Sequence, residues 1–263
     1  MVEDITRTDS YDTPEEKRRL SLWARLFSVQ ISFYAQVGRA VLKGWRVARK
    51  GGYNNALWCE QSRGIIELVE SHGGIFHISG LDHIRRTPGP VVFISNHMST
   101  LESLVLPCLI LPFKDLTFVV KESLLNYPFF GPILKSIEPI AVTRKNPRED
   151  LKTVLQKGGE SLKKGRSVLI FPQSTRYPDL DPERFNTLGI KLAKNAAAPV
   201  IPLALKTDFW PVGRLISDIG PIGRKTRDIY FSFGPPMTIQ GSGKEEHQKV
   251  ISFIQNFLAS IQG

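Results

Sequence analysis

The chain has 263 residues, of which 41% are hydrophobic and 23% are charged. This composition excludes a mostly disordered protein and is sufficient for one α/β domain with a sizeable core and a small additional part. Lysine and arginine number 35 against 25 acidic residues, which gives a net charge of +10. Such a balance is typical of proteins that bind nucleic acid, an anionic membrane or acidic molecules.

Cysteine usage and hydropathy restrict the compartment and the relation to a membrane. Cys59 and Cys108 have no metal-type spacing, which predicts a reducing compartment and no metal site. The longest apolar run, Leu104 to Phe113, contains two prolines and falls short of the roughly 20 residues that cross a bilayer. The first 20 residues show no secretory signal. We therefore expect a protein that can lie on a membrane but does not cross it.

The first part of the chain divides into a loose polar tail, residues 1–19, and an amphipathic segment. Apolar side chains in that segment recur at three- and four-residue steps: Leu20, Trp23, Phe27, Ile31, Tyr34, Val41 and Trp45. Residues 21–50 contain six basic and no acidic residues, and the basic ones lie mostly on the opposite stripe. This pattern predicts a helix of about eight turns, ended by Gly51-Gly52, and a second helix over about 54–71.

The helical part, residues 20–73, has two interpretations. An apolar stripe opposite a basic one suits insertion into an anionic membrane surface better than the reading of nucleic-acid bases, so we predict a membrane anchor and no nucleic-acid partner. Alternatively, the apolar stripe packs on the rest of the protein.

Residues 74–263 alternate short apolar runs with helical patterns. Strands are expected at Ile75–Ile78, Val91–Ile94, Thr117–Val120, Pro139–Val142, Val168–Phe171, Val200–Leu205 and Ile229–Phe233. Helices are expected near Thr100–Leu111, Phe129–Ser136, Arg148–Lys163, Ile190–Asn195 and Glu245–Ile261. This alternation predicts an α/β domain with a mixed, largely parallel sheet flanked by helices.

The most informative segment is a buried strand that ends at Asn96-His97 and is followed by a helix. An imidazole at the carboxyl end of a strand can take a proton from a hydroxyl group, and Glu102 can orient it if His97 lies in the turn before the helix. Two simpler interpretations remain open. Ser99 to Glu102 also fits a helix-capping box, and His97 also fits a hydrogen-bonded core histidine.

Three cations stand at the ends of other expected strands. Lys121 and Arg144 each end a strand, and Arg176 lies in the loop after a third. Because the carboxyl ends of parallel strands meet at one edge, these side chains can converge with His97 and hold a phosphate. Each could equally be a solvated loop charge.

Four segments together resemble the glycerolipid acyltransferase superfamily, typified by bacterial 1-acylglycerol-3-phosphate acyltransferase. Ser95-Asn96-His97 with Glu102 is similar to its first motif, and the apolar run Pro139 to Arg144 is similar to its second. Phe171 to Arg176 is similar to its Phe-Pro-Glu-Gly-Thr-Arg motif, and Val200 to Leu205 is similar to its fourth. The resemblance covers roughly residues 75–235.

The resemblance implies a site and its partners. His97 would be the general base and Glu102 its partner, with Asn96 and Thr175 supporting the motifs. The acceptor phosphate would lie among Lys121, Arg144 and Arg176. The acceptor would be a lysophospholipid and the donor acyl-CoA or acyl carrier protein, with no metal or bound cofactor. The enzyme would be peripheral on the cytoplasmic face of the cell membrane. The alternative is a non-catalytic lipid-binding protein of the same fold.

Two features depart from or compete with the family pattern. Glu102 stands where the family usually has Asp, and Gln173-Ser174 replace its Glu-Gly, which points to a divergent branch. A second string, His77 to Asp82, fits the first motif by letters. We expect it to be a decoy because Gly80 predicts a turn there, with no helix to bring Asp82 back toward His77.

Overall fold

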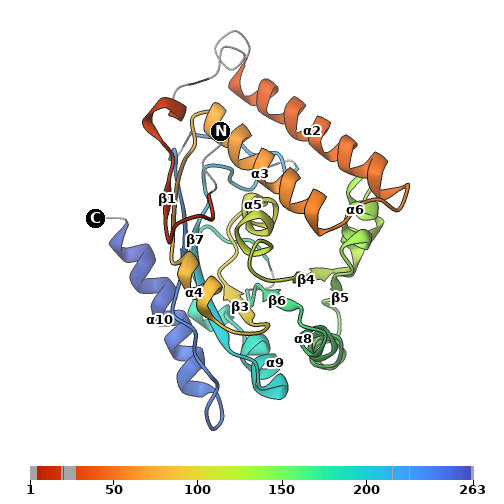
Figure 1. Cartoon of the computed structure of the whole chain (residues 1–263), viewed down its shortest axis with the longest axis vertical. Coiled ribbons are helices and arrows are strands. Elements are labelled where there is room, and N and C mark those ends of the chain that lie inside the picture. The colour runs from red at the N-terminus through yellow and green to blue at the C-terminus, as the bar shows by residue number, and fades with distance from the viewer. Residues whose placement is uncertain are drawn as a thin grey trace.

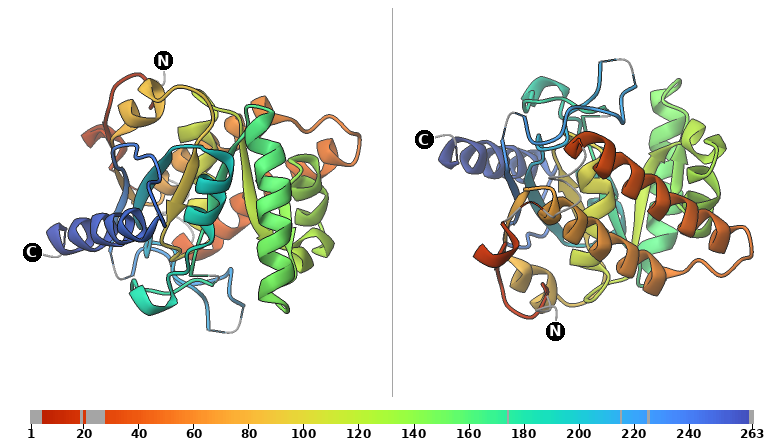
Figure 2. Two further views of the ribbon diagram at one scale, coloured as in Figure 1. Left: turned by 90° about the horizontal axis from the view of Figure 1, so that it is seen from below. Right: turned by 90° about the horizontal axis from the view of Figure 1, so that it is seen from above.

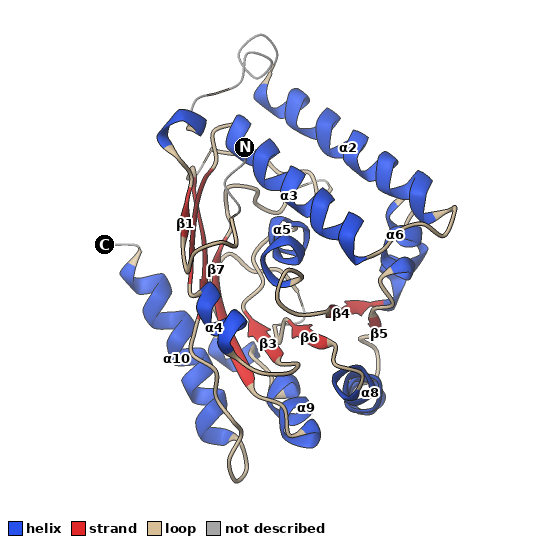
Figure 3. Cartoon of the chain, viewed as in Figure 1, coloured by secondary structure: helices blue, strands red, loops and turns tan. Residues whose placement is uncertain are grey.

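The computed structural model describes residues 5–18, 20, 28–173, 175–214, 216–224 and 226–261. One eight-stranded sheet runs through this part of the chain, in the order β1-β2-β8-β7-β3-β6-β4-β5 (Figures 1 and 3). The strands are β1 (Tyr11–Asp12), β2 (Ile75–Ser79), β3 (Val92–Ser95), β4 (Leu116–Lys121), β5 (Ile140–Val142), β6 (Ser167–Ile170), β7 (Val200–Lys206) and β8 (Asp228–Phe233).

The sheet is mixed but largely parallel, as predicted. Strands β7, β3, β6, β4 and β5 are parallel, so their carboxyl ends share one edge. Strand β8 is antiparallel to β7 and parallel to β2, and β1 is antiparallel to β2. All seven strands expected from the sequence are present, and their ends differ from the expected ones by at most one residue.

Helices cover both faces of the sheet, and the two views of Figure 2 show one layer each. The first layer comprises α2 (Val29–Ala48), α3 (Asn55–Ser71), α5 (Leu101–Ile110) and α6 (Phe130–Ser136). The second comprises α7 (Pro147–Thr153), a π-helical turn (Val154–Gly158), α8 (Gly159–Lys163), α9 (Leu188–Ala196) and α10 (Lys244–Ser260). Outside these layers lie α4 (Leu81–Arg86) and short 3-10 turns at Glu15–Lys17, Glu122–Asn126 and Pro182–Arg184.

Successive side chains of the central strands point to opposite faces of the sheet, so each helical layer covers a separate hydrophobic core. Phe93 and Leu169 join the core beneath α3 and α5, whereas Ile94 and Ile170 join the core beneath α9 and α10. Strands β3 and β6 are buried at every position. This double burial explains why they read as continuous apolar runs in the sequence.

Residues 5–18 correct the expectation of a loose polar tail. Tyr11 is buried and begins β1, and its hydroxyl group donates a hydrogen bond to Glu70 Oε1 at 2.6 Å. Thr13 Oγ1 donates to the same oxygen at 2.9 Å. The segment is ordered because a few inward side chains, among mostly polar neighbours, satisfy a buried carboxylate on α3.

The amphipathic helix α2 uses its apolar side within the protein. Phe33 is fully buried, and Val37, Val41 and Trp45 pack against the core that α3 and α6 share. Packing therefore accounts for the apolar stripe from Tyr34 onward, whereas Ile31, a member of the same stripe, is exposed. The predicted turns over residues 21–27 lie outside the described residues. Among the helices that the structure describes, none is long and apolar enough to cross a bilayer.

Candidate active site

The residues singled out in the sequence follow the parallel strands at their shared edge. His97 lies two residues after β3, Lys121 is the last residue of β4, and Arg144 lies two residues after β5. Arg176 is in the loop that follows β6. Loops at the carboxyl edge of a parallel sheet are where α/β proteins usually place their chemistry.

His97 and Glu102 meet in the turn before α5. The imidazole Nδ1 lies 2.9 Å from Glu102 Oε1, which assigns a proton to Nδ1 and leaves Nε2 as the basic nitrogen. Glu102 has no exposed side-chain surface, whereas 15% of the His97 side chain is exposed. The imidazole stacks on the Phe171 ring with 4.2 Å between centroids. One face of the ring is thus covered, and Nε2 has no hydrogen-bond partner among the described residues.

Glu102 also caps α5, so this carboxylate both orients His97 and caps the helix. Its Oε1 accepts the backbone N–H groups of Met98 and Ser99 at 2.7 and 2.8 Å. Its Oε2 accepts the hydroxyl groups of Ser99 and Thr207 at 2.8 and 2.6 Å. The cap fixes the carboxylate, and the fixed carboxylate orients His97. Thr207, which follows β7, was not anticipated.

The carboxylate is held in its charged form. Burial by itself raises the pKa of Glu102, but the hydrogen bond and charge of His97 and the hydrogen bonds from Thr207 and Ser99 outweigh it and leave the pKa lowered. A charged carboxylate against Nδ1–H stabilises a positive charge on the imidazole.

Two amide side chains fix the backbone on either side of His97. Asn96 Nδ2 donates to the Leu205 carbonyl group at 2.8 Å and its Oδ1 accepts the Leu205 N–H at 2.9 Å, which fastens the end of β3 to β7. Gln173 Oε1 accepts the His97 N–H at 3.2 Å, and its Nε2 donates to the Asp179 carbonyl group at 3.4 Å.

The Gln173 amide explains part of the departure from the family motif. A charged carboxylate would accept from the His97 N–H but would offer the Asp179 carbonyl group no donor. Ser174 lies outside the described residues. Thr175 is exposed, and its backbone N–H donates to the Gln173 carbonyl group at 2.8 Å.

The structure brings two of the three cations together. Arg176 Nη1 donates to Asp218 Oδ1 at 2.6 Å and to the Thr100 hydroxyl group, which itself donates to Asp218 at 2.7 Å. Burial and the nearby charge of Arg176 lower the pKa of Arg144, although Asp150 opposes this. The pKa of Asp218 is raised by burial but lowered further by Thr100 and Arg176, so it is charged.

The role of Lys121 in binding the acceptor phosphate stays a prediction. This lysine is exposed at the end of β4, next to β5, and forms no hydrogen bond or ion pair with another side chain in the described part of the chain. Thr100, Asp218 and the stacking of Phe171 on His97 were not foreseen, because they join segments far apart in the chain.

The second His–acid string, His77 to Asp82, lies away from the carboxyl edge that carries His97. The expectation that no helix follows Gly80 was wrong. A helix, α4, does begin at Leu81 directly after Gly80. Asp82 nevertheless pairs with Arg85 and Arg86 along α4. His77 instead bonds Asp12 at 2.6 Å and Asp228 at 3.2 Å on neighbouring strands.

Comparisons with known proteins agree with this architecture. The family model described as Acyltransferase matches residues 75–206. The chain is 35% identical to the 1-acyl-sn-glycerol-3-phosphate acyltransferase of Pseudomonas aeruginosa over 210 residues, which cover 78% of this chain and 76% of that protein. It is 30% identical to the chloroplastic enzyme of that name from Arabidopsis thaliana, over 49% of this chain and 35% of that one.

A solved structure shares the fold. The 1-acyl-sn-glycerophosphate acyltransferase PlsC of Thermotoga maritima superposes with a TM-score of 0.68 at 16% sequence identity, over 91% of this chain and 97% of that one. The family match includes both halves of the site, from His97 to the loop that carries Arg176. The chain belongs to the acyltransferase family.

Proposed function

We propose that the protein transfers a fatty acyl group from an acyl thioester to the free hydroxyl group of a lysophospholipid, with His97 as the general base. The observation that carries the proposal is the His97–Glu102 pair, which orients the imidazole and leaves Nε2 without a hydrogen-bond partner among the described residues. The names of the relatives support a 1-acylglycerol-3-phosphate type of acceptor. A non-catalytic lipid-binding role gives no reason for a buried, charged carboxylate to orient a partly exposed imidazole.

The reaction needs one proton transfer in each direction. His97 Nε2 takes the proton of the acceptor hydroxyl group while the oxygen of that hydroxyl group attacks the thioester carbonyl carbon. Glu102 stabilises the imidazolium that forms. The carbon–sulfur bond then breaks, and the thiolate leaves with the proton from Nε2. The thioester is already activated, so no acyl-enzyme is needed. The donor is an acyl-CoA or an acyl carrier protein.

Arg176 is prepared to hold the phosphate of the acceptor. Its Nη1 is fixed by Asp218 and Thr100, while its Nε and Nη2 have no partner among the described residues. These two N–H groups form one edge of the guanidinium fork and can bind a phosphate bidentately. Arg144 adds a second positive charge nearby, and Lys121 a third at the same edge of the sheet.

Replacing Arg176 by lysine is expected to lower kcat/KM for a lysophosphatidate acceptor by about 10- to 100-fold, because one charged hydrogen bond and the flat fork are lost. Arg176→Ala and Arg144→Ala are expected to raise the acceptor KM as well. Steady-state kinetics with the acceptor varied measures this. Arg85→Lys, at an ion-paired arginine on α4, is the control. Unchanged acceptor dependence in all three site variants would mean that the phosphate binds elsewhere.

We also propose that the enzyme associates peripherally with the cytoplasmic face of a membrane, through the outer side of α2. Arg39, Lys43 and Arg46 are exposed along the second half of this helix, with Arg49 and Lys50 just beyond it. Anionic lipid attracts each such cation by about 1 kcal/mol. Because the apolar side of α2 is packed within the protein, the basic side replaces the apolar stripe as the expected contact.

Exposed apolar side chains lie at both ends of this basic stripe. Among the described residues, the exposed large hydrophobic side chains are Ile31, Tyr127, Phe129, Val212, Ile216 and Ile219. Ile31 is in the first turn of α2, and the loop with Ile216 and Ile219 is held there because Tyr34 donates a hydrogen bond to Gly220. At the other end, Phe129 lies 5.2 Å from Trp45, between ring centroids. Two apolar contacts flanking a basic surface suit shallow insertion into a bilayer.

Neutralising two cations of α2 is expected to weaken membrane binding. Arg39→Gln with Arg46→Gln should lower the partition coefficient on vesicles with anionic lipid about 30-fold, since about 2 kcal/mol of attraction is removed. Vesicle sedimentation at fixed ionic strength measures it. Lys163→Gln with Lys164→Gln makes the same change in net charge on the opposite layer and is expected to bind as the parent does. Equal binding of both double variants would show that the basic side of α2 is not the membrane-contacting surface.

His77→Ala is expected to keep most acyl-transfer activity. The imidazole bonds two aspartates on β1 and β8, and β8 and β7 separate β2 from β3 in the sheet. Initial rates under conditions in which His97→Ala is inactive test this. If His77→Ala were inactive and His97→Ala active, the assignment of the active site to the end of β3 would be wrong.

A further inference from the structure

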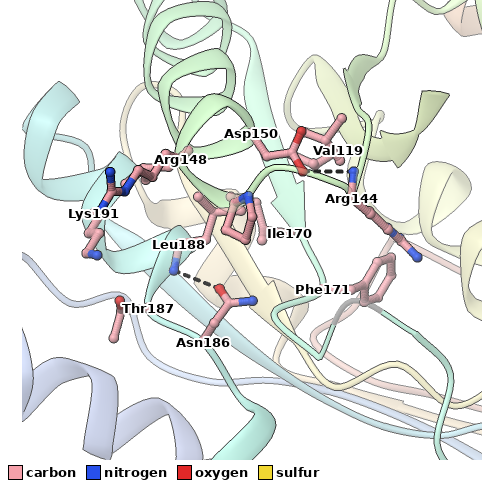
Figure 4. Close-up of a pocket in the computed structure, with 13 residues that line it drawn as sticks. Val119, Arg144, Arg148, Asp150, Ile170, Phe171, Asn186, Thr187, Leu188 and Lys191 are labelled. Atoms are coloured by element: carbon pink, nitrogen blue, oxygen red, sulfur yellow. Dashed lines mark hydrogen bonds between the residues drawn. The ribbon is translucent and has the colours of Figure 1, made fainter.

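A pocket of about 490 Å³ lies at the carboxyl edge of the sheet, between α7 and the start of α9 (Figure 4). Its walls are mostly apolar, with Val119 and Ile170 from the sheet and Leu151 and Leu188 from the two helices. The volume lies in the range of sites for drug-sized ligands. A lone glycerol phosphate headgroup would fill only a small part of it.

The lining of the pocket carries a net positive charge. Arg144, Arg148 and Lys191 line it, and none of them forms an ion pair within the described part of the chain. Asp150, the one acidic residue in the lining, offsets one of these three charges, and its two oxygens accept the backbone N–H groups of Thr143 and Arg144, at 2.8 Å each. An anionic ligand with more than one charged group would match this lining.

The pocket adjoins the catalytic histidine. Phe171 forms part of its wall and also stacks on the His97 imidazole. Figure 4 shows Arg148 and Lys191 grouped on one side of the pocket, with Arg144 and Phe171 on the other. A ligand whose phosphates lie at Arg148 and Lys191 can therefore extend past Phe171 toward His97.

We propose that this pocket binds the nucleotide end of coenzyme A in an acyl-CoA donor. This rests on the proposed acyl transfer and specifies its donor. Arg148 and Lys191 would bind the phosphates, the apolar walls would enclose the adenine ring, and the pantetheine arm would pass Phe171 to bring the thioester to His97. An acyl carrier protein carries a single phosphate on its arm and no nucleotide, so it would leave most of the pocket empty.

The test compares a full donor with a truncated one. In Arg148→Ala with Lys191→Ala, the KM for palmitoyl-CoA is expected to rise about 10- to 100-fold, because two charged contacts are lost. The KM for palmitoyl-pantetheine, which lacks the nucleotide, and the acceptor KM should stay as in the parent. The control, Lys152→Ala with Lys194→Ala, removes two exposed cations one turn further along α7 and α9, outside the pocket lining, and should leave every KM unchanged.

Binding without turnover separates this inference from the proposed function. Calorimetry of the full-length protein with adenosine 3′,5′-bisphosphate is expected to show binding that the pocket variant loses and the control keeps. If the parent binds this nucleotide but transfers no acyl group from any thioester, the proposed function fails and the pocket assignment holds. Equal KM changes for both donors, a change confined to the acceptor or to acyl carrier protein, or no nucleotide binding by the parent would overturn the assignment.

Discussion

Replacing His97 by alanine is expected to lower the rate of acyl transfer by about 10²- to 10⁴-fold, the usual cost of losing a general base. No other described side chain bonded to Glu102 can take over, because Ser99 and Thr207 are hydroxyl groups whose protons point to the carboxylate. Initial rates with saturating acceptor and thioester measure the loss.

The His97→Ala protein is expected to stay folded, which makes the rate interpretable. The backbone N–H of His97 still donates to Gln173, and its carbonyl group still accepts the Tyr177 N–H at 2.9 Å. Glu102 keeps its hydrogen bonds from Met98, Ser99 and Thr207, so its buried charge is not left without donors. Thermal melts of the same samples provide the control. Turnover near that of the parent in a folded variant would remove His97 from the mechanism.

The strands and the His97–Glu102 pair could be predicted from the sequence because their signals are local. Strands β3 and β6 are apolar at every position, since both faces of the sheet are covered. The spacing of His97 and Glu102 is satisfied within one turn, so a strand-to-helix transition was enough to place them together. The two-residue strand at Tyr11 gave no such signal, because one buried side chain among polar neighbours has no period.

The rest of the site depends on contacts between distant segments. Thr207 is 105 residues from Glu102, and Asp218 is 118 residues from Thr100. Neither follows a motif, and Asp218 lies in an irregular loop whose path depends on its hydrogen bonds to α2. The apolar stripe of α2 was visible in the sequence, but its partner was not. The same period fits a bilayer or a protein core, and only the fold shows that the core of this domain covers the stripe from Tyr34 onward.

Replacing Glu102 by glutamine is expected to lower acyl transfer about 100-fold while the protein stays folded. The amide oxygen can still accept from Met98, Ser99 and His97 Nδ1–H, because those three donors fix its orientation. The amide nitrogen then faces the hydroxyl groups of Ser99 and Thr207, which can rotate to accept. The His97 tautomer is thus preserved, and what is lost is the negative charge that stabilises the imidazolium.

Stability and rate measured together separate this role from capping alone. The lowered pKa of Glu102 stabilises the parent above the ordinary glutamate pKa, and that contribution is lost as the pH falls through the lowered value. The parent should therefore exceed Glu102→Gln in thermal stability near neutral pH, and the difference should shrink in acid. Thr207→Val is the matched variant, because it removes one hydrogen bond from Oε2 but keeps the charge, and it is expected to lose far less activity. If Glu102→Gln is destabilised but turns over at the parent's rate, the carboxylate acts only as a helix cap, and His97 takes its proton without an anionic partner.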